Sequence, residues 1–305
     1  MLSEDLARYA HLQRSLGFKF RVQHTLLKNF VAFAEALGDR HVHAHRVIEW
    51  AACAPSPQQR RNRLLTVRRF AIAMRAEDLR HQIPANDAFG RGFFERRIPY
   101  IYTANEIAAL MGAAARLKPA GSIRPLMYET LFGLLAATGM RISEALALRV
   151  EDVKVDGLVI QQTKFQKSRL LPLHDTTRHA IDAYLSVRQR LGALDDALLI
   201  SIAGKAPSYN TVTAVFLRLA RSIGLRGEPG QRGGPRIHDL RHTFAVRSLE
   251  QCRHDRNAVS RHITALSTYL GHAHVTDTYW YLQATPTLMG QIAEAGEALH
   301  QGGVS

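Results

Sequence analysis

A set of side chains between residues 141 and 281 has the chemistry to break a phosphodiester bond without a metal ion. They are two arginines, two histidines, a lysine and one of two tyrosines: Arg141, Arg241, His238, His272, Lys164, and Tyr279 or Tyr281. A phenolic oxygen is a nucleophile, and guanidinium groups clamp phosphate oxygens through paired hydrogen bonds. Fixed cations placed where charge develops can take over the electrostatic role of Mg²⁺. The set therefore predicts attack of a tyrosine on a phosphate.

Two of the arginines have neighbours that suggest how they are held. His238 and Arg241 lie three residues apart and share a face of the helix predicted over residues 238–250. Arg141 follows the end of an apolar segment, and Glu144 is its nearest carboxylate. A charge between buried segments must be paired or must bind a ligand. Taken alone, each pair also fits a blander interpretation, a solvated helix start in one case and a structural ion pair in the other.

Two tyrosines near the C-terminus compete for the role of nucleophile. Tyr279 and Tyr281 would point about 200° apart on a helix. Only one of them can therefore face a given site, and the other has a structural role.

A mixed α and β segment must position these groups. Residues 123–137 are apolar nearly all round, which predicts a buried helix. Thr103 and Glu106 predict a capping box at the start of the preceding helix. The apolar runs 158–160 and 169–173 predict the strands of a small antiparallel hairpin. Further helices are predicted over residues 141–148, 176–191, 208–223, 238–250, 261–270 and 287–299.

The first third of the chain predicts helices only. Apolar residues recur with helical spacing over residues 26–37 and 58–79. On the second of these helices three arginines lie seven residues apart and form a stripe, Arg61, Arg68 and Arg75. The stripe fits the phosphate backbone of DNA, and it equally fits a solvated face. Residues 81–102 contain Pro and Gly and predict a connector.

These elements predict a mainly α protein with a small antiparallel β-sheet, an α+β fold in two domains. Residues 1–97 are expected to form an all-helical domain. Residues 98–305 are expected to form a mixed domain that ends in a helical tail.

The charge of the chain favours a polyanionic partner. Its 305 residues include 40 Lys and Arg against 26 Asp and Glu, a net charge of +14, and the pI is near 10.3. A basic balance of this size favours nucleic acid. No apolar run approaches the length of a membrane span, the first residues do not resemble a secretory signal, and the two cysteines lack disulfide-framework spacing. A reducing cytoplasm of bacterial type is therefore expected, with the protein on the nucleoid when it binds DNA.

In combination and in this order, the motifs resemble the tyrosine recombinase family of site-specific recombinases and phage-type integrases. The resemblance is dense over residues 136–282 and looser over the first third, which looks like the family's core-binding domain. The matching segments are Ala136–Glu144, Thr163-Lys164, Lys167–Leu173, His238–His242 and Leu270–His272. The family's nucleophile follows that last histidine by nine residues, which selects Tyr281. The ending Tyr279–Leu282 also looks like a transposon-associated subgroup.

The resemblance implies a mechanism and a set of roles. Tyr281 would form a 3′-phosphotyrosine bond, Lys164 would protonate the leaving 5′-oxygen, and Glu144 would orient Arg141. Arg141 and Arg241 would clamp the non-bridging oxygens of the phosphate. His238 and His272 would donate hydrogen bonds to it, and His238 is also a candidate proton acceptor. Contacts to the DNA backbone would come from basic residues outside this set, Arg61, Arg68, Arg75, Lys167 and Arg169.

The resemblance also implies partners. The two domains would clamp duplex DNA, with no metal and no cofactor, and protomers would assemble on DNA as a homo-oligomer, a tetramer, with or without other recombinases of the same element. The apolar stripe of the tail, Leu288, Ile292, Ala295 and Leu299, would pack on its own domain or dock on a neighbouring protomer.

Three alternatives remain open from the sequence. A type IB topoisomerase uses a similar tyrosine set to relax supercoils as a monomer. A non-catalytic DNA-binding regulator would use the basic helices alone. A metal phosphodiesterase would use a histidine cluster such as His41, His43 and His45, although no carboxylate cluster accompanies it in the sequence.

Overall fold

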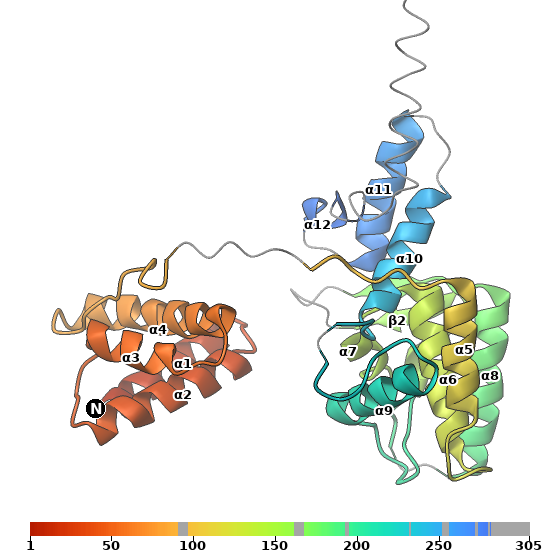
Figure 1. Ribbon diagram of the computed structural model, residues 1–305, viewed down its shortest axis with the longest axis horizontal. Coiled ribbons are helices and arrows are strands. Elements are labelled where there is room, and N and C mark those ends of the chain that lie inside the picture. Colours follow the sequence, from red (N-terminus) through yellow and green to blue (C-terminus); the bar gives the residue numbers. More distant parts are fainter. Residues whose placement is uncertain are drawn as a thin grey trace, which may run out of the picture. The chain divides into compact units, whose positions relative to one another are not determined.

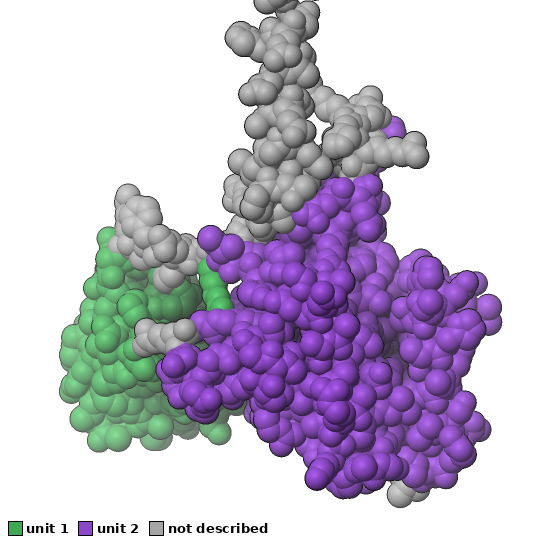
Figure 2. All heavy atoms as spheres, turned by 45° about the vertical axis from the view of Figure 1, so that its right-hand side comes forward, with its two compact units in different colours: residues 1–97 green, residues 98–305 purple. Residues whose placement is uncertain are grey.

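The chain folds into two compact units, residues 1–97 and 98–305 (Figures 1 and 2). The computed structural model describes residues 1–90, 97–161, 168–192, 195–231, 233–251, 256–271, 274–279 and 281. Among them, no helix has both the length and the apolar composition to cross a bilayer.

The first unit is a four-helix assembly. Its helices are α1 (Leu2–Ser15), α2 (Arg21–Ala36), α3 (Ala44–Ala52) and α4 (Pro57–Glu77). Pro57 occupies the first turn of α4, and the hydroxyl of Ser56 accepts a hydrogen bond from the Gln59 N–H, so the helix start is capped. The buried face of α4 repeats with helical spacing through Leu64, Val67, Phe70, Ala71 and Met74. These side chains pack on α1, α2 and α3 to form a core of this unit alone.

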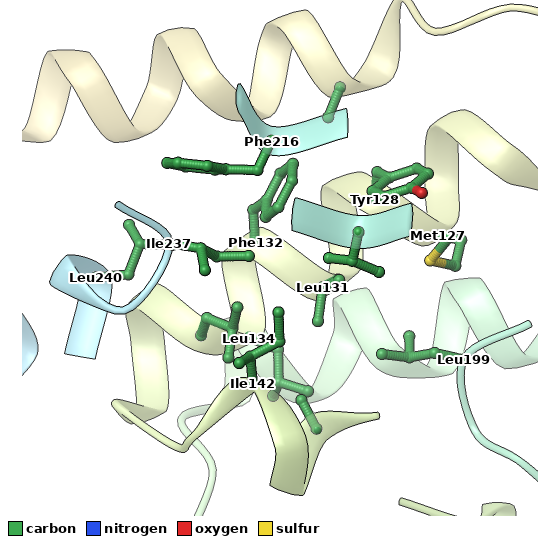
Figure 3. Close-up of a cluster of buried hydrophobic side chains, with 14 of the residues drawn as sticks. Met127, Tyr128, Leu131, Phe132, Leu134, Ile142, Leu199, Phe216, Ile237 and Leu240 are labelled. Carbon is green, nitrogen blue, oxygen red and sulfur yellow. The ribbon is translucent and has the colours of Figure 1, made fainter. Parts of the chain in front are cut away.

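The second unit is mainly helical. Its helices are α5 (Ala104–Ala115), α6 (Ile123–Thr138), α7 (Ile142–Ala145), α8 (Asp175–Arg190), α9 (Tyr209–Ser222), α10 (Asp239–Glu250), α11 (Arg256–Leu270) and α12 (Thr276–Tyr279), with a short 3-10 helix at Val150–Asp152. Helix α6 packs against α5, α8 and α10, which explains why it is apolar on nearly every side. Figure 3 shows its side chains Met127, Leu131 and Phe132 among those of the surrounding elements.

A three-stranded antiparallel sheet lies beside these helices, in the order β1-β2-β3. The strands are β1 (Val153–Lys154), β2 (Gly157–Ile160) and β3 (Arg169–Leu171). Leu158 pairs with Leu171 and Ile160 with Arg169, so the first residue of β3 lies opposite the last residue of β2.

The observed fold confirms the predicted class, mainly α with a small antiparallel sheet. The buried helix over residues 123–137 and the capping box of Thr103 and Glu106 are also present. Two details differ. The helix predicted over 141–148 is one turn, α7, and β1 adds a strand of two residues that is too short to show as a pattern in the sequence. The predicted tail helix, 287–299, lies outside the described residues.

Candidate active site

The end of α6 places Arg141. The helix stops at Gly139, which has a left-handed φ of 60° and donates its N–H to the carbonyl of Leu135. An added Cβ at this position would lie 2.4 Å from Cδ1 of Phe244, so the close approach of α10 also requires glycine. The chain then turns back and begins α7 with Arg141 as its N-cap. The arginine is thereby fixed between two helices.

The guanidinium of Arg141 contacts two elements. Its Nη1 donates to Oε1 of Glu144 at 2.8 Å, and its Nη2 donates to the carbonyl of Gly271 at 3.2 Å. The backbone N–H of Arg141 donates to the other oxygen of Glu144 at 2.9 Å. About a third of the side chain, 31%, remains exposed, so a ligand can reach it.

Arg241 lies deeper, on the first turns of α10. Its Nη1 donates to the carbonyl of Gly139 and its Nη2 to that of Leu270, both at 2.8 Å. Burial and then the charge of Arg141 lower the pKa of Arg241 to about 10. The side chain therefore stays charged at neutral pH, and the two guanidinium groups are close enough to repel each other. Such a pair is a ready receptor for an anion.

Glu144 offsets part of this repulsion. Its carboxylate is nearly buried and accepts hydrogen bonds from Arg141 and from Arg169. Desolvation raises the pKa of Glu144, but the hydrogen bonds from Arg169 and Arg141, together with the charge of Arg169, outweigh it and lower the pKa to about 2. The group is therefore an anion at neutral pH.

His238 lies just before α10, next to Arg241. Burial lowers its pKa, and the charge of Arg241 lowers it further, so its imidazole is neutral at neutral pH. Its ring lies edge-on to that of His242, with centroids 4.8 Å apart. A neutral imidazole can accept a proton from a neighbouring hydroxyl.

Tyr281 packs on α10 and α11 and is 3% exposed. Its ring centroid is 5.5 Å from that of His242. Charge on its phenol would raise the pKa of Arg241, which shows that the two groups are neighbours. The structure thus brings Arg141, His238, Arg241 and Tyr281 together at one place.

Not every predicted residue can be placed. Lys164, Lys167 and His272 lie outside the described residues, and the same holds for the side chain of Tyr279. In the first unit, Arg61, Arg68 and Arg75 are each partly exposed along α4. The guanidinium of Arg75 donates to the carbonyls of two residues beyond the helix, Leu79 and His81.

Arg169, which was expected to contact DNA, has its side chain largely enclosed by the protein. Its side chain is 13% exposed, and each of its guanidinium nitrogens has a protein partner. Nε donates to the carbonyl of Tyr269 at 2.8 Å, while Nη1 and Nη2 donate to the two oxygens of Glu144 at 3.2 and 2.8 Å.

Several supporting residues have no signal in the sequence that would select them. His242 belongs to the motif His238–His242 and has no predicted role of its own, yet its ring contacts both His238 and Tyr281. The Thr243 hydroxyl accepts the backbone N–H of Tyr102, and Arg247 donates to the Tyr102 carbonyl, so the segment before α5 is anchored on α10. Contacts over such separations leave no local pattern that could have revealed them.

A metal site is not supported by the histidines of the first unit. Among the described residues, one group of possible ligands comes together, His41, Asp78 and His81, with ligand atoms within 4.8 Å of one another. The backbone N–H of Val42 donates to Nδ1 of His81, so the neutral ring carries its own proton on Nε2, the atom left to bind a metal. Both oxygens of Asp78 already accept hydrogen bonds from the guanidinium of Arg80. These residues therefore do not fit a metal ion.

Comparison with known proteins identifies the class. The sequence pattern of the phage integrase family matches residues 101–287. The putative integrase/recombinase y4rB of Sinorhizobium fredii is 38% identical over 298 residues, which cover 94% of each chain. The chain belongs to the phage integrase family, the tyrosine recombinases, whose members cleave and rejoin DNA.

Solved structures of recombinases share the fold. The integrase of the transposon Tn1549, in complex with transposon right end DNA, has a TM-score of 0.65 at 17% identity, and the match covers 96% of this chain and 98% of the other. A lambda integrase tetramer bound to a Holliday junction has a TM-score of 0.59 at 19% identity, with 90% and 78% covered.

Proposed function

We propose that this tyrosine recombinase cuts and rejoins specific DNA sites through a 3′-phosphotyrosine bond on Tyr281. The observation that carries the proposal is the convergence of Arg141 and Arg241, which reach the adjacent carbonyls of Gly271 and Leu270, beside His238 and Tyr281. Two permanent cations next to a phenol and a neutral imidazole form a site for a phosphate under nucleophilic attack.

In the proposed reaction the phenolic oxygen of Tyr281 bonds to phosphorus, and the bond from phosphorus to the 5′-oxygen breaks. Arg141 and Arg241 stabilise the charge that grows on the non-bridging oxygens. A free phenol has a pKa near 10, so it needs a proton acceptor or a strongly cationic site. The lowered pKa of His238 supports its role as that acceptor.

The remaining steps use residues outside the described part of the chain. Lys164 is proposed to protonate the leaving 5′-oxygen, and His272 to donate a hydrogen bond to the phosphate. A 5′-hydroxyl on the cleaved strand of the second duplex then attacks the phosphotyrosine and releases Tyr281. Because the ester retains the energy of the broken bond, neither ATP nor a metal is needed, and the reaction should continue in EDTA.

Duplex DNA is the proposed substrate, held by both units. The partly exposed arginines of α4 are proposed to contact phosphates from the first unit, and Lys167 from the second. Exchange joins two duplexes and needs four strand cleavages, which supports a tetramer on DNA. The lambda integrase tetramer bound to a Holliday junction has a related fold.

Formation of a covalent adduct tests the proposal. Overlapping duplexes that together cover the DNA on both sides of the gene are incubated with the protein and EDTA and run on denaturing gels. Each duplex carries a nick, and a nick close to the cleavage position traps the adduct. Wild type should give a protein–DNA adduct that contains Tyr281. The variant Tyr281→Phe should give none, and the matched control Tyr279→Phe should retain it.

Three outcomes would contradict the proposal in distinct ways. An adduct retained by Tyr281→Phe and lost by Tyr279→Phe would assign the other tyrosine. Cleavage that EDTA abolishes would indicate a metal enzyme. Relaxation of supercoiled plasmid without exchange between two sites would indicate a topoisomerase.

A further inference from the structure

Three consecutive carbonyls at the end of α11 are each bonded by a different arginine. Tyr269 accepts from Arg169, Leu270 accepts from Arg241, and Gly271 accepts from Arg141. The last carbonyls of a helix lack partners within the helix and carry the negative end of its dipole. Cationic donors from β3, α10 and the start of α7 therefore cap α11 together.

The three arginines differ in what else they do. Arg141 and Arg241 are the proposed phosphate ligands, whereas each guanidinium nitrogen of Arg169 is already bonded within the protein. The guanidinium of Arg169 also lies against Gly271, where an added Cβ would be 2.7 Å from Nη1. Arg169 is thus enclosed by the segment that it caps.

Glu144 connects Arg169 to Arg141. Its Oε1 accepts from both guanidinium groups, at 2.8 Å from Arg141 and 3.2 Å from Arg169, and its Oε2 accepts from Arg169 and from the backbone of Arg141. Two forked contacts on one carboxylate hold the carboxylate in a single orientation. The orientation of the Arg141 guanidinium therefore depends on Arg169, which the phosphate does not touch.

The geometry points to Arg169 as a positioning residue that holds the end of α11 and, through Glu144, aims Arg141 at the phosphate. A bound phosphate draws on Arg141 and Arg241, while Arg169 keeps its bonds to Tyr269 and Glu144. Strand β3, the first strand after the segment of Lys164, is fixed to the same point. This role rests on the proposed function and replaces the direct DNA contact expected of Arg169.

The test separates DNA binding from cleavage. Arg169→Ala and Arg169→Lys are compared with wild type and with Arg190→Ala, an exposed arginine on α8. On a nicked site that gives an adduct with wild type, Arg169→Ala should bind DNA with unchanged Kd and unchanged salt dependence. Its cleavage rate at saturating DNA should fall by about 100-fold, since small misplacements of catalytic groups cost that much. Arg169→Lys should fall nearly as far, because an ammonium cannot fork between two acceptors, and Arg190→Ala should match wild type.

Two results on DNA would overturn the positioning role. The first is wild-type cleavage by Arg169→Ala. The second is weaker DNA binding by Arg169→Ala with a salt slope reduced by about 0.9, which would place Arg169 on a phosphate. Addition of methylguanidinium to Arg169→Ala should restore part of the cleavage rate, with equal NaCl as the control, whereas damage to the fold would not be restored in this way.

A second measurement does not depend on catalysis. Amide hydrogen exchange in the last turn of α11 should be faster in Arg169→Ala than in wild type and unchanged in Arg190→Ala. Unchanged exchange in Arg169→Ala would overturn the positioning role even if no substrate were found. Absence of an adduct from wild type, with faster exchange in Arg169→Ala, would instead count against the proposed function alone.

Discussion

Replacing Glu144 by Gln should destabilise the second unit by about 3 kcal/mol at neutral pH. The pKa of Glu144 falls from 4.5 to about 2 in the folded protein, and a difference of that size corresponds to about 3 kcal/mol of preferential interaction with the charged form. The amide of Gln would turn an N–H₂ toward the donors of Arg141 or Arg169. Removal of one partner from a nearly buried ion pair typically costs about 3–5 kcal/mol, in agreement with this value.

Urea unfolding followed by brief proteolysis measures the effect, with fragments of the two units scored separately. The midpoint of the first unit should not change, because its core contains no part of this network, and it serves as the internal control. With an m-value of about 1–3 kcal/mol/M, the midpoint of the second unit should fall by about 1–3 M.

The pH dependence gives a sharper check. Because the folded-state pKa of Glu144 is depressed, its stabilisation is complete above the unfolded value of 4.5 and is lost as the pH falls toward 2. The difference in stability between wild type and Glu144→Gln should therefore shrink over that range. A difference below about 1 kcal/mol at neutral pH, or one that does not change with acid, would refute the assigned role of this carboxylate.

The remaining predictions concern the turn, the imidazole and the arginine stripe. Gly139→Ala should destabilise the second unit by about 2–3 kcal/mol in urea unfolding, because position 139 has a left-handed φ and an added Cβ would overlap with Phe244. Adding Phe244→Ala to this variant should recover part of the lost stability. Because the pKa of His238 is lowered from 6.5, the cleavage rate at saturating DNA should stay constant from about pH 8 to about pH 6.5 and decline only in more acidic buffer. A steep decline between about pH 8 and 7 would argue against a neutral imidazole. Arg75→Ala should lower the stability of the first unit by about 1 kcal/mol, since two backbone carbonyls lose their donor. Arg61→Ala should leave that stability unchanged and reduce the salt slope of DNA binding by about 0.9; the opposite pattern would exclude a phosphate contact by Arg61.

Local signals in the sequence predicted much of the fold. The hydroxyl of Thr103 and the carboxylate of Glu106 cap a helix three residues apart, so the sequence contains both partners of the interaction. The buried helix over residues 123–137 was predicted because its apolar residues surround it on every side. The family resemblance then brought together distant residues that no periodicity connects.

The surroundings of Arg169 show where such prediction ends. Its partners are Glu144, 25 positions away, and Tyr269, 100 positions away, and nothing next to Arg169 in the sequence indicates either of them. A basic residue beside a predicted hairpin in a strongly basic chain is assigned to DNA by default. Whether an arginine faces solvent or caps a helix depends on tertiary packing, which local spacing does not encode.

The division of the chain into two compact units, each with hydrophobic clusters of its own, has a consequence for affinity. Residues 78–103 join α4 to α5, so the protein would act as a bivalent ligand for a duplex that both units contact, as proposed above. Once one unit is bound, the other would be present at a local concentration of up to about the millimolar range. Two weak contacts with DNA would then give a high overall affinity. Proteolytic cutting between the units would abolish this increase in affinity while leaving each unit folded.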